Sequence, residues 1–123
     1  KHYLGVDVVA SVIETNTRLF GAHHVKFQVL NPCDEKIPHV DLIIMNCVAQ
    51  HLPNAFVKSM LDRISTHCRW ALIGNDWIAI NGQGDIMMGA WHPINILLPP
   101  FNLNGVTIAN WNGKHITLSK FPD

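Results

Sequence analysis

The sequence predicts an α/β fold with a mostly parallel sheet, helices on both faces of the sheet and an antiparallel hairpin at the C-terminal end. Short apolar segments rich in β-branched residues alternate with segments of helical periodicity, which is the pattern of parallel strands buried on both faces. Near the end of the chain, two strand-like segments, 105–111 and 114–121, are joined by Asn112-Gly113. This dipeptide is typical of a type I′ turn, so the two segments are predicted to form a hairpin.

Four further strands are predicted upstream of the hairpin, at 2–9, 25–31, 40–46 and 69–76. Each segment is short and apolar, and each ends next to turn residues or to a helical segment. Residues 40–46 (VDLIIMN) are apolar on both faces, which indicates a strand in the centre of a sheet.

Two helices are predicted between these strands. The first begins at Ser11, a candidate N-cap whose capping-box partner is Glu14, and Gly21 is a plausible stop. The second covers 54–68, where apolar residues line one side. The segment 77–103 has loop chemistry, with three glycines, three prolines and two tryptophans over 27 residues. Loops of this length are usually functional or wrapped around a neighbouring element.

The composition indicates one globular domain over residues 1–123. Hydrophobic residues make up 48% of the chain and charged residues 15%, which suffices for a core. Nine basic and nine acidic residues cancel, so no overall field favours nucleic acid or an anionic membrane as a partner. No apolar run reaches the length of a membrane span. The three cysteines are odd in number and form no CxxC motif, which favours reduced thiols and a cytoplasmic protein.

Short polar residues stand at the carboxyl ends of the predicted strands. Ligands of parallel sheets bind outside these ends, because the loops there meet at one edge of the sheet. We therefore expect a ligand site built from Asp7, Asn31-Pro32, Asn46-Cys47 and Asn75-Asp76-Trp77.

These strand ends resemble those of class I S-adenosylmethionine-dependent methyltransferases. The stretch YLGVDVVASVIETNTRLF is similar to the family's second strand and the helix after it, and VDLIIMNCVAQHL to its fourth strand and following loop. The stretch GDIMMGAWHPINILLPPFNL is similar to the GGWRPLNLQxPPFNLP loop of one methyltransferase subgroup, and is the most specific match. The resemblance covers nearly the whole chain. It implies a Rossmann-like fold, methyl transfer and S-adenosylmethionine as cofactor.

The resemblance also implies residues for the nucleoside end of the cofactor. Asp7, with Val8 beside it, matches an acidic residue that accepts hydrogen bonds from both ribose hydroxyls. Asn31, followed by Pro32, stands where an aspartate receives the adenine amino group, and it keeps an acceptor without the charge. From the residues alone, Asp7 could equally cap the following helix, and Asn31-Pro32 is also a good turn pair.

At the fourth strand of the family, Asn46 and Cys47 match positions that flank the methionine part of the cofactor, although they could simply end a buried strand. His51 is a candidate base for a substrate hydroxyl or amine, or an ordinary surface histidine. His92 stands where the subgroup pattern has an arginine, which puts an anion-binding role there in doubt. A substrate wall, or alternatively the packing that holds the long loop, is expected from Trp77, Trp91 and His92.

One part of the family pattern is not in this sequence. The family's first strand and its Gly-rich turn, of the DxGCGxG kind, should lie upstream of Tyr3, and in the family that strand lies between those matched by 2–9 and 40–46. We therefore expect an N-terminally incomplete, truncated domain. The strand belongs to a longer native chain, or another chain supplies it through a strand swap, or 2–9 and 40–46 pair directly and the cofactor site is lost.

The sequence thus predicts a partial methyltransferase that transfers the methyl group of S-adenosylmethionine to a small-molecule acceptor. A non-catalytic methyltransferase-like module for binding or assembly is the alternative, and a different enzyme acting on the same cofactor is a third. Homo-oligomers are compatible with each. No zinc-ligand spacing, GxSxG elbow or phosphate-binding GxxxxGK[ST] motif is present, so the sequence predicts no metal site and no such hydrolase or nucleotide-phosphate chemistry.

Overall fold

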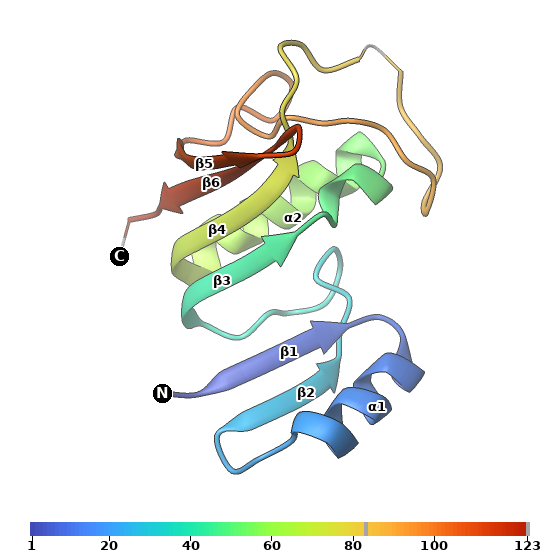
Figure 1. Ribbon diagram of the computed structural model, residues 1–123, viewed down its shortest axis with the longest axis vertical. Coiled ribbons are helices and arrows are strands. Elements are labelled where there is room, and N and C mark those ends of the chain that lie inside the picture. The colour runs from blue at the N-terminus through green and yellow to red at the C-terminus, as the bar shows by residue number, and fades with distance from the viewer. Residues whose placement is uncertain (83, 123) are drawn as a thin grey trace. The chain divides into compact units, whose positions relative to one another are not determined.

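The computed structural model in Figure 1 describes residues 1–82 and 84–122, so residue 83 of the predicted long loop lies outside it. The chain divides into two compact units, Lys1–Ile37 (unit 1) and Pro38–Asp123 (unit 2). Each unit is described by itself. The expectation of a single domain over 1–123 stays a prediction.

Unit 1 is a strand–helix–strand element. Strand β1 (Tyr3–Asp7) pairs in parallel with β2 (Val25–Val29), and helix α1 (Ala10–Phe20) connects them. The helix packs on both strands and buries Ile13 against them. All three elements agree with the predicted ones.

The predicted N-cap of α1 is wrong. The helix begins at Ala10, before Ser11, and no side chain caps it. The N-cap position is occupied by Val9. The backbone N–H of Val9 donates a hydrogen bond of 2.9 Å to the Oδ1 atom of Asp7, which fixes the chain just before the helix. Strand and helix are therefore joined by a tighter connection than a Ser11 cap would allow.

Unit 2 contains a four-stranded mixed sheet (Figure 1). Its spatial order is β3-β4-β6-β5, with β3 and β4 parallel and β6 antiparallel to both of its neighbours. Helix α2 and the short 3-10 turn η1 connect β3 to β4. The bounds are β3 Val40–Asn46, η1 Ala49–His51, α2 Asn54–His67, β4 Cys68–Asp76, β5 Val106–Trp111 and β6 Lys114–Lys120.

The hairpin prediction is confirmed. Strands β5 and β6 pair antiparallel around Asn112 and Gly113, whose φ angles of 48° and 70° are both in the left-handed region that a type I′ turn requires. The predicted α/β class, with parallel strands and a C-terminal antiparallel hairpin, is confirmed with it.

The core of unit 2 lies on one face of its sheet. Ala71 and Ile73 of β4 are fully buried, as are Val57 and Met60 of α2, because alternate strand residues point toward the helix. The long segment after β4 contributes two more residues to the core, Ile94 and Ile96, at 1% and 0% exposure.

The central position predicted for residues 40–46 is not what the structure has. Strand β3 pairs with β4 alone among the described residues and is an edge of its sheet. Ile44 is 69% exposed, so the second apolar face of β3 is uncovered. No helix in the described part of the chain is long and apolar enough to cross a membrane.

Candidate functional site

The carboxyl edge of the β1–β2 sheet carries the two residues expected at the nucleoside end of a cofactor. Asp7 lies opposite Val29 in the parallel register, and the backbone N–H of Leu30 donates to the carbonyl of Asp7 over 3.0 Å. Asn31 therefore follows directly at the end of the neighbouring strand. The fold of unit 1 brings Asp7 and Asn31 to one edge, as predicted, although their roles there stay predictions.

Both side chains at this edge also have local structural partners. Asp7 bonds to Val9 through Oδ1, while Asn31 Oδ1 accepts from the N–H of Cys33 over 3.1 Å and forms an Asx turn. A carboxylate accepts about four hydrogen bonds and an amide oxygen about two, so both retain acceptor capacity. Of the neighbours expected at the site, Val8 is 59% exposed and Pro32 is half-buried.

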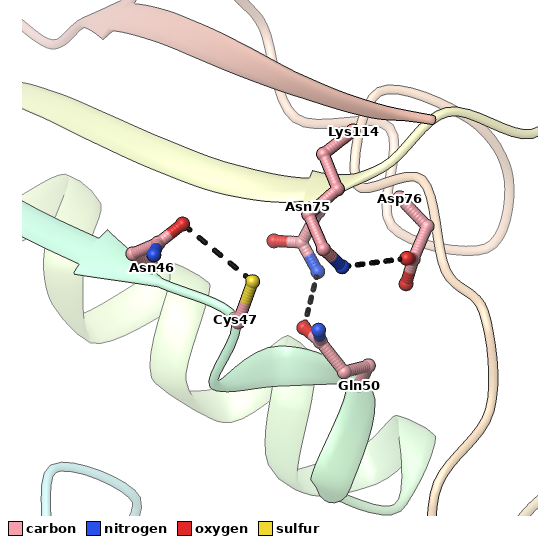
Figure 2. Close-up of polar contacts among 6 residues, drawn as sticks. All are labelled: Asn46, Cys47, Gln50, Asn75, Asp76 and Lys114. Atoms are coloured by element: carbon pink, nitrogen blue, oxygen red, sulfur yellow. Dashed lines mark hydrogen bonds and ion pairs between the residues drawn. The ribbon is translucent and has the colours of Figure 1, made fainter. Parts of the chain in front are cut away.

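In unit 2 the carboxyl end of β3 turns sharply at Cys47. This residue has a φ of 55°, a conformation that few non-glycine residues adopt, and its N–H donates to the carbonyl of Gly74 over 2.9 Å. The exposed Asn46 side chain lies over Gly74, where a Cβ atom would meet its Oδ1. Cys47 Sγ lies 3.6 Å from Asn46 Oδ1 (Figure 2). Glycine at 74 thus leaves room for the side chain of Asn46.

Two further polar pairs, Asn75–Gln50 and Asp76–Lys114, lie at the ends of β4 and β6 (Figure 2). Gln50 and Asn75 are 2% and 0% exposed, and the Asn75 amide donates to Gln50 Oε1 over 3.2 Å. Asp76 follows on β4, and its Oδ1 lies 3.0 Å from the ammonium of Lys114 on β6. Among the described residues, the buried atoms Asn75 Oδ1 and Asp76 Oδ2 have no hydrogen-bond partner. Buried polar groups without a partner are uncommon and often mark a functional site.

The charges in this cluster affect one another. The hydrogen bond to Asp76 is the main cause that raises the pKa of Lys114. His115, next along β6, is fully buried, and burial lowers its pKa although the negative charge of Asp76 opposes this. Neither ring nitrogen of His115 has a partner among the described residues. The edge of the imidazole packs against Trp77, with ring centroids 5.3 Å apart at 89°.

We expect His115 to make the stability of unit 2 depend on pH. Its folded pKa lies below its unfolded value of about 6.5. Above the unfolded pKa the ring is neutral in both states, so its burial costs no stability. As pH falls below the unfolded pKa and through the folded pKa, the unfolded state binds a proton more readily, and stability is lost. Urea unfolding of the wild type and of His115→Phe between pH 8 and pH 5 should show a smaller loss in the variant. An unchanged pH profile would contradict this, and His23→Ala, at an exposed histidine, is the control.

The long segment after β4 is fixed to η1 by three hydrogen bonds at positions predicted to be functional. His51 Nδ1 lies 3.1 Å from the carbonyl of Ala90, and the carbonyl of His51 accepts from Gly89. The N–H of His92 donates to the carbonyl of Gln50. Because a carbonyl oxygen only accepts, the His51 contact places the proton of the neutral ring on Nδ1 and leaves Nε2 as an acceptor.

The three residues of the predicted substrate wall have different local partners. Trp77 contacts His115 and the β5–β6 hairpin, whereas the backbone of His92 bonds to η1 and its Nε2 atom is buried. Trp77 and Trp91 are 56% and 58% exposed. Substrate contact and loop packing both stay predictions for these residues.

The polar cluster of unit 2 contains both expected and unexpected residues. Asn75 and Asp76 were expected in a ligand site at the strand ends, without individual roles. Gln50 and Lys114 were not predicted as site residues. The antiparallel register, in which Asp76 lies opposite Lys114, could have indicated the ion pair once β4 and β6 were known to be neighbours. Within the described residues, no three or more His, Cys, Asp or Glu side chains gather as a metal site would need.

The fold is that of the class I methyltransferases. The chain is similar to the N-methyltransferase NodS from Bradyrhizobium japonicum, solved with S-adenosyl-L-homocysteine, with a TM-score of 0.67 at 13% identity. This match covers 99% of the present chain and 67% of NodS. The methyltransferase SibL matches with a TM-score of 0.67 at 9% identity, covering 99% of this chain and 44% of SibL.

Human N-acetylserotonin methyltransferase, solved with S-adenosylmethionine, is also similar. Its TM-score is 0.66 at 13% identity, over 98% of this chain and 40% of the human enzyme. The chain thus spans less than half the length of two of these three proteins. No protein-family model matches the sequence, and no curated protein matches it significantly. The likeness is one of fold, and it confirms the predicted Rossmann-like class.

Proposed function

We propose that this chain is part of an S-adenosylmethionine-dependent methyltransferase that acts on a small-molecule acceptor. The observation that carries the proposal is the pair Asp7 and Asn31 at the carboxyl ends of adjacent parallel strands. They occur in a fold that three solved methyltransferases share over nearly the whole chain. Ligands of such sheets bind at these ends.

In this proposal unit 1 holds the nucleoside. The Asp7 carboxylate accepts from the ribose hydroxyls with its remaining lone pairs, with Val8 beside the ribose. The Asn31 amide oxygen accepts from the adenine amino group, and the ring of Pro32 restricts the backbone of the turn. The chemistry of these groups fits an adenosine, because the ribose hydroxyls and the amino group are donors and both side chains supply acceptors.

In unit 2 we assign Asn46 and Cys47 to the reacting end of the cofactor. When bound, S-adenosylmethionine supplies a methyl group on a sulfonium. Methyl transfer needs alignment and exclusion of water more than strong acid–base groups. The left-handed turn at Cys47 and the buried Gln50–Asn75 hydrogen bond fix the backbone and side chains against which the reacting groups would be aligned.

His51 is proposed as the general base for the acceptor. Its Nδ1 atom is bonded to Ala90, which supports an unprotonated Nε2 in the neutral ring. An oriented imidazole of this kind can take a proton from a hydroxyl or amine. Trp91, exposed one residue after Ala90, is assigned to the acceptor side.

A non-catalytic module is the second candidate. The observation that favours it is the buried Nε2 atom of His92, since His92 stands where the methyltransferase subgroup has an arginine. In either case we place the protein in the cytoplasm, on the ground of its three cysteines, which form no disulfide among the described residues. A homo-oligomer or a strand swap would pair the free edge of β3.

Binding of the cofactor product is the direct test. We expect S-adenosylhomocysteine to bind the chain saturably in isothermal titration calorimetry, and to raise its unfolding temperature. At 100 times the Kd, the stabilisation should be about 2.7 kcal/mol. Adenosine should bind more weakly, and guanosine, which has no adenine amino group, should not compete. An absence of both heat and thermal shift would reject the cofactor site in this chain.

A further inference from the structure

A cleft of about 350 Å³ lies at the tip of the β5–β6 hairpin, wholly within unit 2. Its volume is in the range of small-molecule sites, which run from about 300 to 1,000 Å³. It is lined by Trp77, Asn110, Trp111, Asn112, Gly113 and Lys114.

Two indole rings give the cleft apolar walls that are open to solvent. Trp77 is 56% exposed and Trp111 is 75% exposed. Exposed large aromatic side chains that gather at one place usually mark a binding surface, since each indole can contribute a large contact area to a ligand.

The wall formed by Trp77 is held in place before any ligand binds. The backbone N–H of Trp77 donates to the carbonyl of Gly113 over 2.7 Å, which ties the end of β4 to the hairpin turn. The Trp77 indole packs at a right angle against the buried ring of His115. Trp77 is therefore positioned in advance, so a ligand would lose little affinity through the ordering of this side chain.

Polar groups at the rim favour a ligand that accepts hydrogen bonds. Lys114 has three N–H donors, one of which lies 3.0 Å from Asp76 Oδ1, and its side chain is 36% exposed. Asn110 and Asn112 are exposed and carry amide donors of their own. A cationic ligand would be repelled by the ammonium of Lys114 at this rim.

We propose that this cleft binds a flat aromatic small molecule that carries an acceptor oxygen, such as a carboxylate, carbonyl or phenolate. The aromatic ring stacks on the indoles of Trp77 and Trp111, and the oxygen accepts from Lys114. This binding does not depend on the proposed methyl transfer.

The probe that tests the cleft is 2-naphthoate, followed through the indole N–H signals of the four tryptophans in ¹H–¹⁵N NMR spectra. The signals of Trp77 and Trp111 should shift saturably, and those of Trp70 and Trp91 should not. On the wild-type chain, decahydro-2-naphthoate, which lacks the flat ring, should bind about tenfold more weakly. Replacing the carboxylate by an ammonium, in 2-naphthylmethylammonium, should weaken binding by a similar factor.

A matched pair of variants completes the test. Trp111→Ala should weaken binding of 2-naphthoate about tenfold, whereas Phe20→Ala, at an exposed aromatic side chain outside the cleft, should leave it unchanged. Equal shifts of all four indole signals, or an undiminished affinity in Trp111→Ala, would overturn the proposal. Binding of 2-naphthoate without binding of S-adenosylhomocysteine would support the cleft and count against the proposed methyl transfer alone.

Discussion

Replacement of Asn81 by alanine is expected to lower the free energy of unfolding of unit 2 by about 2–5 kcal/mol, because several buried backbone groups lose their partners. The Asn81 side chain is buried in the segment after β4. Its Oδ1 accepts from the N–H of Asn95 over 2.7 Å, and its Nδ2 donates to the carbonyls of Asn95 and Pro99 over 2.9 and 2.7 Å. No neighbouring side chain can replace all three bonds at once.

The loss should be measured by urea unfolding with tryptophan fluorescence, since Trp77 and Trp91 lie in the affected segment. Against a typical stability of about 5–15 kcal/mol, the expected change is large. Asn104→Ala, at an exposed asparagine of the same segment, is the matched control and should change stability by less than about 0.5 kcal/mol. Equal effects of the two substitutions would show that Asn81 does not organise the loop.

The loop around Asn81 shows where local sequence patterns stop being informative. An asparagine beside a glycine is an ordinary turn signal, and nothing in the pattern distinguishes Asn81 from Asn104. The structural role of Asn81 depends on hydrogen bonds to carbonyls that lie 14 and 18 residues further along the chain. Likewise Asp85 bonds the N–H of Asn54, at the start of α2, across 31 residues. Such pairs depend on tertiary position, which periodicity does not encode.

Most of the regular elements could be predicted, because burial and turn chemistry act within a few residues. Residues 40–46 form β3 with the predicted bounds, and the helix predicted at 54–68 is observed at Asn54–His67. Asn112-Gly113 adopts the predicted turn, because the left-handed conformation at both positions is accessible to few other residue pairs.

Two local predictions failed for identifiable reasons. The Ser11 cap is absent, since the carboxylate of Asp7 reaches Val9 first and starts the helix earlier. The interpretation of β3 as a central strand rested on two apolar faces, whereas the structure gives β3 one paired edge and an exposed Ile44. Apolar residues on both faces of a strand indicate that both faces tend to be buried. They do not identify the strand or helix that would bury them.

The candidate site could be predicted in outline. The rule that ligands bind at the carboxyl ends of parallel strands selected Asp7 and Asn31 on adjacent strands, and the structure has them at one edge. The Asp76–Lys114 pair was missed, since it needs the antiparallel register of β6 against β4. The sequence alone defines the hairpin but not the strand beside which it lies.

Replacement of Asp7 by alanine is expected to weaken the binding of S-adenosylhomocysteine by about 10- to 100-fold. A hydrogen bond to a charged group contributes about 1.5–3 kcal/mol, and the ribose would offer two donors to this carboxylate. Asn31→Ala should weaken binding only severalfold, because a neutral amide contributes about 1 kcal/mol. Isothermal titration calorimetry measures both, and Glu14→Ala, at an exposed acid on α1, is the control for loss of negative charge.

The result of Asp7→Ala alone would be ambiguous, because Asp7 also accepts a hydrogen bond from the N–H of Val9 and fixes the start of α1. Asp7→Asn separates the two roles. The amide oxygen can still accept from Val9, so the unfolding temperature without ligand should stay near that of the wild type. The loss of charge should still lower the affinity. If Asp7→Asn binds as tightly as the wild type while Asp7→Ala loses both binding and stability, Asp7 is a helix-entry residue, and the nucleoside must be recognised elsewhere.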